Sequence, residues 1–522
     1  MDPNYILVWI VGGTVALQFI GGLRQPTGNI GWLCVYTFVL ILLGTGLLRT
    51  PQVAGYAAGV AWLVLVVLPF VAIQIVHYLS IKKRYHAAVW FARIAAVFHP
   101  ADGWRHHPAL CRALGMAHDG RIDEACASLE QYRNDHHWFG RLARAYIYRL
   151  NHDWQAFIDW FESGKIAGNE LDSAIYYIRA IGEAGRLNDM VAQFAEMRAG
   201  FGRRDGDLRN LCRLFVFAFS GRTETLERLF RNRLAVFPPQ VQSYWLATAW
   251  LARRNEENAR KEYEAIQSSD DRLTQHEGAW RFDNPPAPAD GLSAPSLRIL
   301  DDEELQLDHD ERYGFRPSVK RSKAVVTLSL IFVNLIVFCI EMSAGGATDL
   351  KTLTTLGAVV PAWVMDGQWW RIAVATFLHY GALHLMMNML ALLALGPYLE
   401  FALGPLRYIT TYIAAGFGSM LAIVLLSRLT HSELVPVLGA SGGVMGVVGA
   451  IAAVYMRGWR RDRAHVAHTQ LVLVLLIIII QMVFDVVTPN VSFLAHFSGA
   501  LIGFALASIQ RHEFAALNQE TQ

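Results

Sequence analysis

Nine apolar runs constrain the fold of this chain more than any other feature of its sequence. Each is long enough to cross about 30 Å of hydrocarbon as a helix, and 53% of all residues are hydrophobic while only 17% are charged. The runs lie near residues 5–22, 30–48, 56–80, 324–341, 373–395, 408–427, 434–456, 469–487 and 492–508. Because a segment in lipid must satisfy its own backbone hydrogen bonds, the sequence predicts an all-α polytopic membrane protein.

Positive residues flank the long polar region between the third and fourth runs. Lys82-Lys83-Arg84 follows the third run, and four basic residues precede the fourth, namely Arg316, Lys320, Arg321 and Lys323. The positive-inside rule therefore predicts that the polar region is cytoplasmic and the N-terminus outside. Counting crossings also places a basic cluster at 457–463 and the C-terminus inside. We expect an integral multi-pass protein of a bacterial inner (plasma) membrane.

The charge balance and the cysteines exclude several kinds of partner. The formal net charge is +2, and the positive residues gather at membrane edges, so nucleic acid is not an expected partner. The cysteines lack the paired spacing of metal sites and are interpreted as reduced, small apolar residues; they are Cys34, Cys111, Cys126, Cys212 and Cys339. No cofactor is expected.

A short turn motif recurs through the polar region. Its five copies occupy residues 120–125, 151–156, 185–190, 221–226 and 254–259. The spacing of about 34 residues is that of tetratricopeptide helix-turn-helix repeats, although an irregular helical array also fits. Such stacked helices offer a concave surface. We expect either a protein partner on these repeats or a purely architectural role.

The sequence thus divides into five parts. Residues 1–81 form three transmembrane helices, and 82–267 form a cytosolic, α-solenoid-like set of tetratricopeptide-like repeats. Several prolines and an acidic run mark 268–322 as a linker. Residues 323–510 form a six-helix membrane core, and 511–522 form a C-terminal tail.

The membrane core carries an ordered set of motifs. These are Trp369-Trp370-Arg371, His379-Tyr380-Gly381-Ala382-Leu383-His384, Asn388, Gly439-Ala440-Ser441-Gly442 and Ala495-His496 followed by Gly499 and Gly503. Together they resemble the rhomboid intramembrane serine proteases over about residues 320–510. The predicted topology adds a separate argument, because His379, His384 and Asn388 fall in the outer half of one helix and Ser441 and His496 in the outer halves of two others. Polar groups at one depth of a membrane suggest a water-accessible site.

The resemblance implies a role for each of these residues. Ser441 would be the nucleophile, and His496 its general base and then general acid. His384 and Asn388, four residues apart on one helical face, would form the oxyanion hole with the Ser441 backbone N–H. His379, about 140° from His384 around the same helix, is assigned a supporting role.

Other positions are interpreted as structural. Glu400, Gly404 and Arg407 match a further family motif at the inner membrane side, and Arg371 suits the membrane interface. Met445 stands where family members often have an aromatic residue beside the histidine. Asp485 is assigned an interfacial or gating role in preference to a third catalytic role.

The sequence therefore predicts an intramembrane serine endopeptidase that cleaves transmembrane protein substrates near the outer membrane face through a Ser-His dyad in the lipid bilayer. The alternative is a catalytically silent rhomboid-like scaffold that binds membrane clients and recruits partners through its repeats. A transporter is a third interpretation, but no inverted repeat is apparent. Zinc chemistry is disfavoured because no His-Glu-x-x-His pattern occurs.

Overall fold

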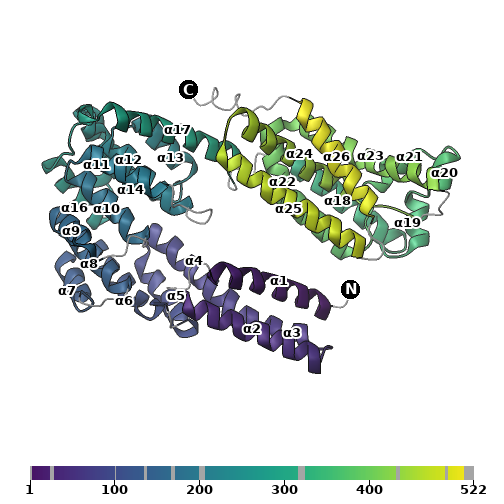
Figure 1. The fold of residues 1–522 in the computed structure, drawn as a ribbon, viewed down its shortest axis with the longest axis horizontal. Helices are drawn as coiled ribbons and strands as arrows, with labels where there is room; N and C mark the ends of the chain where they lie inside the picture. The colour runs from purple at the N-terminus through teal and green to yellow at the C-terminus, as the bar shows by residue number, and fades with distance from the viewer. Residues whose placement is uncertain are drawn as a thin grey trace. The chain divides into compact units, whose positions relative to one another are not determined.

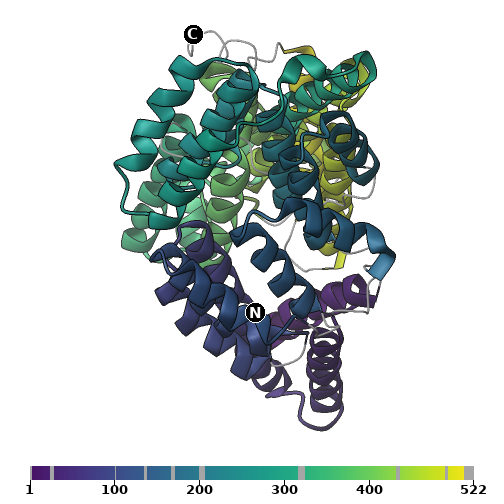
Figure 2. The ribbon, with the colours of Figure 1, turned by 90° about the vertical axis from the view of Figure 1, so that its left-hand side faces the viewer.

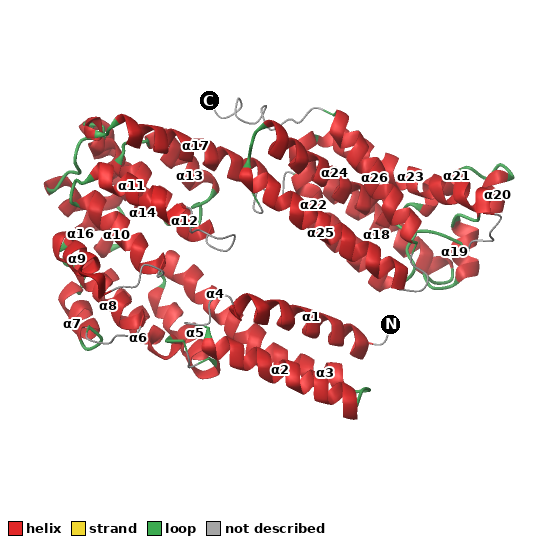
Figure 3. Cartoon of the chain, in the orientation of Figure 1, coloured by secondary structure: helices red, strands yellow, loops and turns green. Residues whose placement is uncertain are grey.

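In a computed structural model, the protein is built of helices (Figures 1 and 3). The structure describes residues 3–23, 29–99, 102–133, 138–165, 171–198, 206–314, 324–430, 436–487 and 492–510. Across these ranges it contains one isolated β-bridge and no strand. The all-α prediction is confirmed. The predicted tail at 511–522 and the basic residues at 316–323 lie outside the described residues.

The chain forms two compact units, Met1–Asp301 and Asp302–Gln522. Seven helices in the described ranges are long and apolar enough to cross a membrane: Ile30–Arg49, Ala54–Ile81, Val325–Ala344, Ala382–Leu403, Pro405–Ser427, Ser441–Arg461 and His465–Val487. Two further apolar helices, Leu7–Leu23 and Phe493–Ile509, occupy predicted runs but are shorter. The chain is therefore a multi-pass membrane protein.

The first unit begins with three apolar segments, as predicted. They are α1 (Pro3–Leu23), α2 (Ile30–Arg49) and a helix that runs from α3 (Ala54–Trp62) through a π-helical turn (Leu63–Val67) into α4 (Leu68–Ile81). Small and β-branched side chains such as Val15, Val39 and Ala58 are buried where these helices meet. Their other faces expose large apolar side chains, which suits contact with lipid.

Helical pairs follow, and their stack faces the viewer in Figure 2. The helices are α5 (Tyr85–Phe98), α6 (His107–His118), α7 (Ile122–Glu130), α8 (Trp138–Leu150), α9 (Trp154–Trp160), α10 (Leu171–Glu183), α11 (Leu187–Arg198), α12 (Gly206–Phe219), α13 (Thr223–Asn232), α14 (Pro239–Ala252) and α15 (Glu256–Gln267). Short helical turns lie at Trp104–His106 and Phe161–Lys165. Each copy of the turn motif begins between two of these helices.

Each recurring turn contains one residue in the left-handed conformation, which ends the first helix of the pair. These residues are Gly120, His152, Gly185, Gly221 and Arg254. The second copy differs in register from its prediction. Because α9 begins two residues after His152, as α7 does after Gly120, the residue equivalent to Ala125 is Phe157 and not Ala156.

The segment predicted as a linker is largely helical, which corrects that interpretation. It contains α16 (Arg272–Asp283), a short turn at Ala289–Gly291 and α17 (Ala294–Tyr313). The prolines at 285–288 lie between the helices, and the acidic run lies within α17. Both helices bury apolar residues such as Leu273, Leu300 and Leu307. Packing of these side chains stabilises the two helices although much of their sequence is polar.

Helix α16 packs against the first helices of successive pairs. Glu277 accepts a hydrogen bond from Arg149 of α8 at 3.1 Å, and Arg281 donates to Glu183 of α10 at 2.5 Å. Asp271, just before α16, pairs with His118 of α6 at 2.9 Å. Helix α16 therefore covers part of the surface that the first helices of these pairs present.

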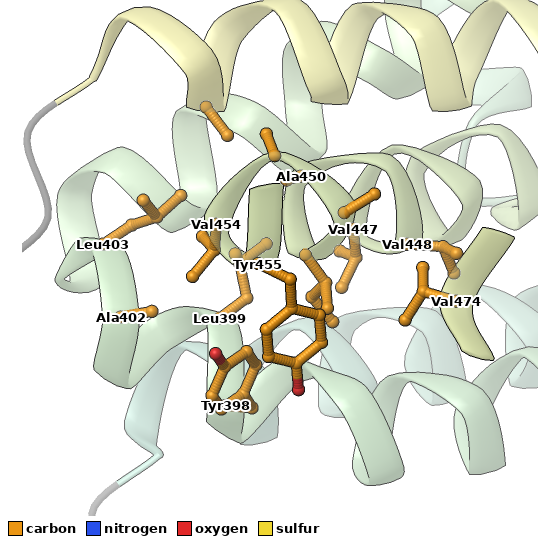
Figure 4. Packing of buried hydrophobic residues seen from close by; sticks show 14 of the residues in the cluster. Tyr398, Leu399, Ala402, Leu403, Val447, Val448, Ala450, Val454, Tyr455 and Val474 are labelled. Carbon is orange, nitrogen blue, oxygen red and sulfur yellow. The ribbon is translucent and has the colours of Figure 1, made fainter. Parts of the chain in front are cut away.

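After the end of α17, the described residues of the second unit form six long apolar helices and three short ones. The long helices are α18 (Val325–Ala344), α22 (Ala382–Leu403), α23 (Pro405–Thr430), α24 (Ser441–Arg461), α25 (His465–Val487) and α26 (Phe493–Ile509). The short helices α19 (Leu350–Leu356), α20 (Pro361–Met365) and α21 (Trp370–Ala375) lie between α18 and α22. Helix α24 is central, with Val447, Ala450 and Val454 in a core that also takes Leu399 of α22 and Val474 of α25 (Figure 4).

Two predicted spans start later than their apolar runs suggest. The run at 373–395 breaks at Gly381, which has φ of +85° before α22 begins, and the run at 434–456 breaks at Gly439, with φ of +138° before α24 begins. Hydrophobicity cannot detect such breaks because the residues on both sides are apolar. As a result, two candidate site residues lie at or near helix N-termini.

Candidate functional site

Ser441 is the first residue of α24, and the segment before it is held in place by backbone hydrogen bonds. Val437 and Val359 pair through two bonds of 2.9 and 3.0 Å, and the Gly439 N–H donates to the Ala375 carbonyl at 2.9 Å. The first N–H groups of a helix have no partner within that helix. The Ser441 hydroxyl and its own N–H are therefore both placed at a helix end.

His384 lies in the first turn of α22, beside Ser441. The imidazole Nε2 and the Ser441 Oγ lie 3.4 and 3.3 Å from the point that a Cβ on Gly439 would occupy. The backbone N–H of Tyr380 donates to the His384 Nδ1 at 3.3 Å. In a neutral imidazole this contact leaves the proton on Nε2, so His384 presents a donor to the side where Ser441 stands.

Asn388 follows one turn later on α22 and is buried. Its Nδ2 atom has no hydrogen-bond partner among the described residues. A buried amide donor without an acceptor costs free energy, and such groups often await a ligand or reaction intermediate. Asn388 is thus a buried amide donor without an acceptor on the helix that carries His384.

His379 does not share the helix with His384, which corrects the predicted position. It lies in the loop before α22 and is fully buried, with its backbone N–H donating to Glu341 Oε1 of α18 at 2.9 Å. Its ring lies edge-on to the His384 ring, with the centroids 5.4 Å apart. His379 therefore supports the placement of His384. Glu341 itself was missed, although a carboxylate in an apolar run is a signal of function or fixation.

His496 lies in the first turn of α26, which begins after a helix cap. The Ser492 Oγ accepts a hydrogen bond from the Ala495 N–H at 3.2 Å. The His496 Nδ1 lies 2.7 Å from Asp485 Oδ2 of α25, and the Gln481 Nε2 donates to Asp485 Oδ1 at 2.8 Å. The Asp485 side chain is fully buried, and the interfacial or gating role suggested by the sequence stays a prediction.

Glycines bring α24 and α26 together at the site. A Cβ on Gly499 would overlap the carbonyl oxygen of Gly442, and a Cβ on Gly503 would overlap that of Gly446. The predicted small-residue contact is therefore confirmed. The residues next to Ser441 and His496 touch, because the Ala495 carbonyl lies 3.8 Å from the Cβ position of Gly442. The described residues show no hydrogen bond between Ser441 and His496 themselves.

His384 and Ala495, in the first turns of α22 and α26, thus lie near the start of α24. The N-terminus of a helix carries a partial positive charge and free N–H donors. An arrangement of this kind stabilises negative charge that develops on an oxygen atom beside Ser441. Of the predicted site residues, His384 lies beside Ser441, and Asn388 follows one turn later on the same helix.

Arg371 and Glu400 brace the site from a distance. Arg371 donates to the carbonyls of Thr354 and Ala358 at 2.6 and 3.0 Å, and so ties the loop between α18 and α22 together. Glu400 accepts the backbone N–H groups of Val326 and Thr327 at 2.9 Å each, which caps α18. Both contacts agree with the structural roles expected from the sequence.

Residues 366–513 match the model of the rhomboid domain. The chain is 30% identical over 205 residues to the rhomboid protease GluP of Bacillus subtilis, covering 39% of this chain and 38% of that protein. It is 34% identical over 164 residues to RHOMBOID-like protein 5 of Arabidopsis thaliana, covering 31% of this chain and 50% of that protein. It is 31% identical over 98 residues to the rhomboid protease AarA of Providencia stuartii, covering 18% and 35%.

The chain thus spans half or less of the length of these relatives. No solved structure matches it at a significant level. The match to the domain model includes Ser441, His496, His384, Asn388 and Asp485. The second unit of this multi-pass membrane protein therefore carries a region similar to the rhomboid domain, and that region contains the site.

Proposed function

We propose that the protein is an intramembrane serine endopeptidase of the rhomboid type, which cleaves transmembrane protein substrates. One observation carries the proposal: Ser441 stands at a helix N-terminus beside the His384 ring, in a region similar to rhomboid proteases. In this proposal Ser441 is the nucleophile, His496 is the base, and His384 and Asn388 are the donors. These are the components that acyl transfer requires.

In the proposed reaction, Ser441 Oγ attacks the carbonyl carbon of the scissile peptide bond while its proton passes to His496 Nε2. The negative charge on the carbonyl oxygen is then stabilised by the Ser441 N–H, His384 Nε2–H and Asn388 Nδ2–H groups. When the C–N bond breaks, His496 gives the proton to the leaving amine. Water attacks the resulting ester through the same base, which frees the acid product and restores Ser441.

The proposed membrane orientation follows from charge. Arg457, Arg460 and Arg461 lie in the last turns of α24, and Ser441 lies at its first residue. A helix of 21 residues is about 30 Å long, which is the thickness of the hydrocarbon layer. If the arginines are cytoplasmic, then Ser441 and the cleavage point lie toward the outer face. The first unit then has its repeats in the cytoplasm.

A fluorophosphonate probe and a transmembrane reporter test this proposal together. Purified wild-type protein is expected to react with the probe at Ser441 and to cleave the reporter. Ser441→Ala abolishes both, and His496→Ala reduces both by several orders of magnitude. The exposed Ser343→Ala variant, on α18, is the matched control and retains wild-type activity. Equal cleavage of the reporter by wild type and Ser441→Ala would contradict the proposal.

The alternative function is a silent scaffold that binds membrane clients. This alternative is supported by the lack of a hydrogen bond between the Ser441 and His496 side chains in the described residues. A scaffold would bind the reporter without cleaving it and without reacting with the probe. A partner of the repeats would have to use a surface other than the one that α16 occupies, or displace that helix.

A further inference from the structure

The contact between Asp485 and His496 joins two helices of the second unit. Asp485 lies in α25, eleven residues before His496 in α26. The carboxylate and the imidazole are both shielded, with side-chain exposures of 0% and 10%. Removing a carboxylate from water carries a large cost unless its oxygens are bonded. Both Asp485 oxygens are bonded, one to His496 and the other to Gln481.

We infer that Asp485 is a positioning residue for catalysis, which holds His496 in the tautomer that can accept the proton of Ser441. This inference rests on the proposed function of the same site. An ionised carboxylate is only an acceptor, so the Nδ1 atom 2.7 Å away carries the hydrogen. The lone pair of the neutral ring is then on Nε2, the atom that a general base needs.

Gln481 fixes the carboxylate in turn. Its Nε2 donates to Asp485 Oδ1 from one turn earlier on α25, so the carboxylate plane cannot rotate freely. The chain of contacts runs from Gln481 to Asp485 to His496. Because α24 and α26 are held together by their glycines, this chain fixes the imidazole on the helix that packs against the helix of Ser441.

A packing role and a positioning role for Asp485 predict opposite orders of activity for the variants Asp485→Asn and Asp485→Ala. Asn has nearly the shape of Asp, so it should damage packing less than Ala does. For proton transfer Asn is the worse replacement, because its amide can donate to His496 Nδ1 and force the hydrogen onto Nε2. Replacing the equivalent carboxylate of a soluble serine protease by an amide lowers kcat by about 10⁴.

The test measures reporter cleavage by the full chain in detergent for wild type, Asp485→Asn, Asp485→Ala and Asp485→Glu. We expect a fall in kcat of about 10²- to 10⁴-fold for Asp485→Asn, at least as large as for Asp485→Ala, with KM unchanged. Asp485→Glu should recover part of the rate. Gln470→Leu, a buried polar site near the other end of α25, controls for loss of a polar group in this helix and should retain activity.

A second comparison separates positioning from folding. In the background of His496→Ala, Asp485→Asn should cause no further loss, because the ring that it orients is gone. An active wild type with Asp485→Asn within about threefold of it would overturn the inference and leave the proposed function intact. Activity that falls more for Ala than for Asn, in parallel with thermal stability, would also overturn it. A wild type that neither cleaves nor reacts with the probe would instead reject the proposed function.

Discussion

Gly499 of α26 faces the backbone carbonyl of Gly442 in α24 so closely that a Cβ atom has no room between them. The contact is repeated one turn later by Gly503 and Gly446. These two pairs set the distance between the helices that carry His496 and Ser441. The lack of side chains at these four glycines therefore determines the geometry of the site as much as its polar side chains do.

Gly499→Val should separate α24 from α26. The new side chain would overlap the Gly442 carbonyl, and overpacking of this kind costs about 1–3 kcal/mol. We expect a lower midpoint of thermal unfolding in detergent and a loss of reporter cleavage. Leu501→Ala, at an exposed position of the same helix, is the matched control. Wild-type activity in Gly499→Val would contradict the close contact.

Asn388→Ala should affect the reaction more than the fold. Its Nδ2 atom has no partner in the described residues, so truncation breaks no donor hydrogen bond of the resting protein. Loss of one oxyanion donor is expected to lower kcat by about 10²- to 10³-fold with little change in KM. The midpoint of thermal unfolding should be unchanged or slightly higher than in wild type. A large drop in stability with unchanged kcat would assign Asn388 to packing instead.

The ion pair of Arg281 and Glu183 should be costly to break from one side. Both side chains are buried, at 2% and 0% exposure, so Glu183→Gln leaves Arg281 as a buried, poorly compensated charge. Loss of one partner of such a pair costs about 3–5 kcal/mol. Arg179 also pairs with Glu183, at 3.3 Å, so the triple variant Glu183→Leu, Arg281→Met and Arg179→Met should be closer to wild type. Limited proteolysis and thermal unfolding of the full chain measure the stability of these variants. If Glu183→Gln is as stable as wild type, this ion pair does not hold α16 in place.

Acid should destabilise the first unit, and the direction follows from three groups around α16. Burial alone would raise the pKa of Glu277, but the guanidinium groups of Arg149 and Arg179 lower this pKa to about 2. Burial opposes ionisation of Asp271 as well, but His118 and Lys83 keep the pKa of that carboxyl below its ordinary range. Burial of His152, which stacks on Trp280, lowers the pKa of the imidazole to about 4.

The sign is the same for all three groups. A carboxyl with a lowered pKa stabilises the fold above its unfolded pKa, and this stability is lost as the pH falls toward its folded pKa. A histidine with a lowered pKa must be kept neutral in the fold, which costs stability once the unfolded histidine becomes protonated. We expect unfolding to become easier from about pH 6.5 downward and steeply below about pH 4.5. Glu277→Gln should flatten the lower part of this profile, and a profile independent of pH would contradict the argument.

Particular residues show why the sequence predicted some parts of the site and not others. Ser441, His496, His384 and Asn388 could be found because their motifs are local and ordered along the chain. Their converging arrangement also followed from counting apolar runs. The contact of Asp485 with His496 could not be found in this way, because it depends on how α25 packs against α26. The position of His379 was wrong for a similar reason, since Gly381 breaks a run that hydrophobicity alone extends through it.

By itself, the sequence determined that the chain is helical, inserts in membranes and carries helix-turn-helix pairs between two apolar blocks, because the length and period of apolar segments act locally. Only the tertiary structure decided that α16 contacts the first helices of those pairs, that helices begin at Ser441 and near His384 and His496, and that Asp485 contacts His496. These relationships depend on burial and close approach between residues distant in the chain, and no local pattern encodes which carboxylate will meet which imidazole.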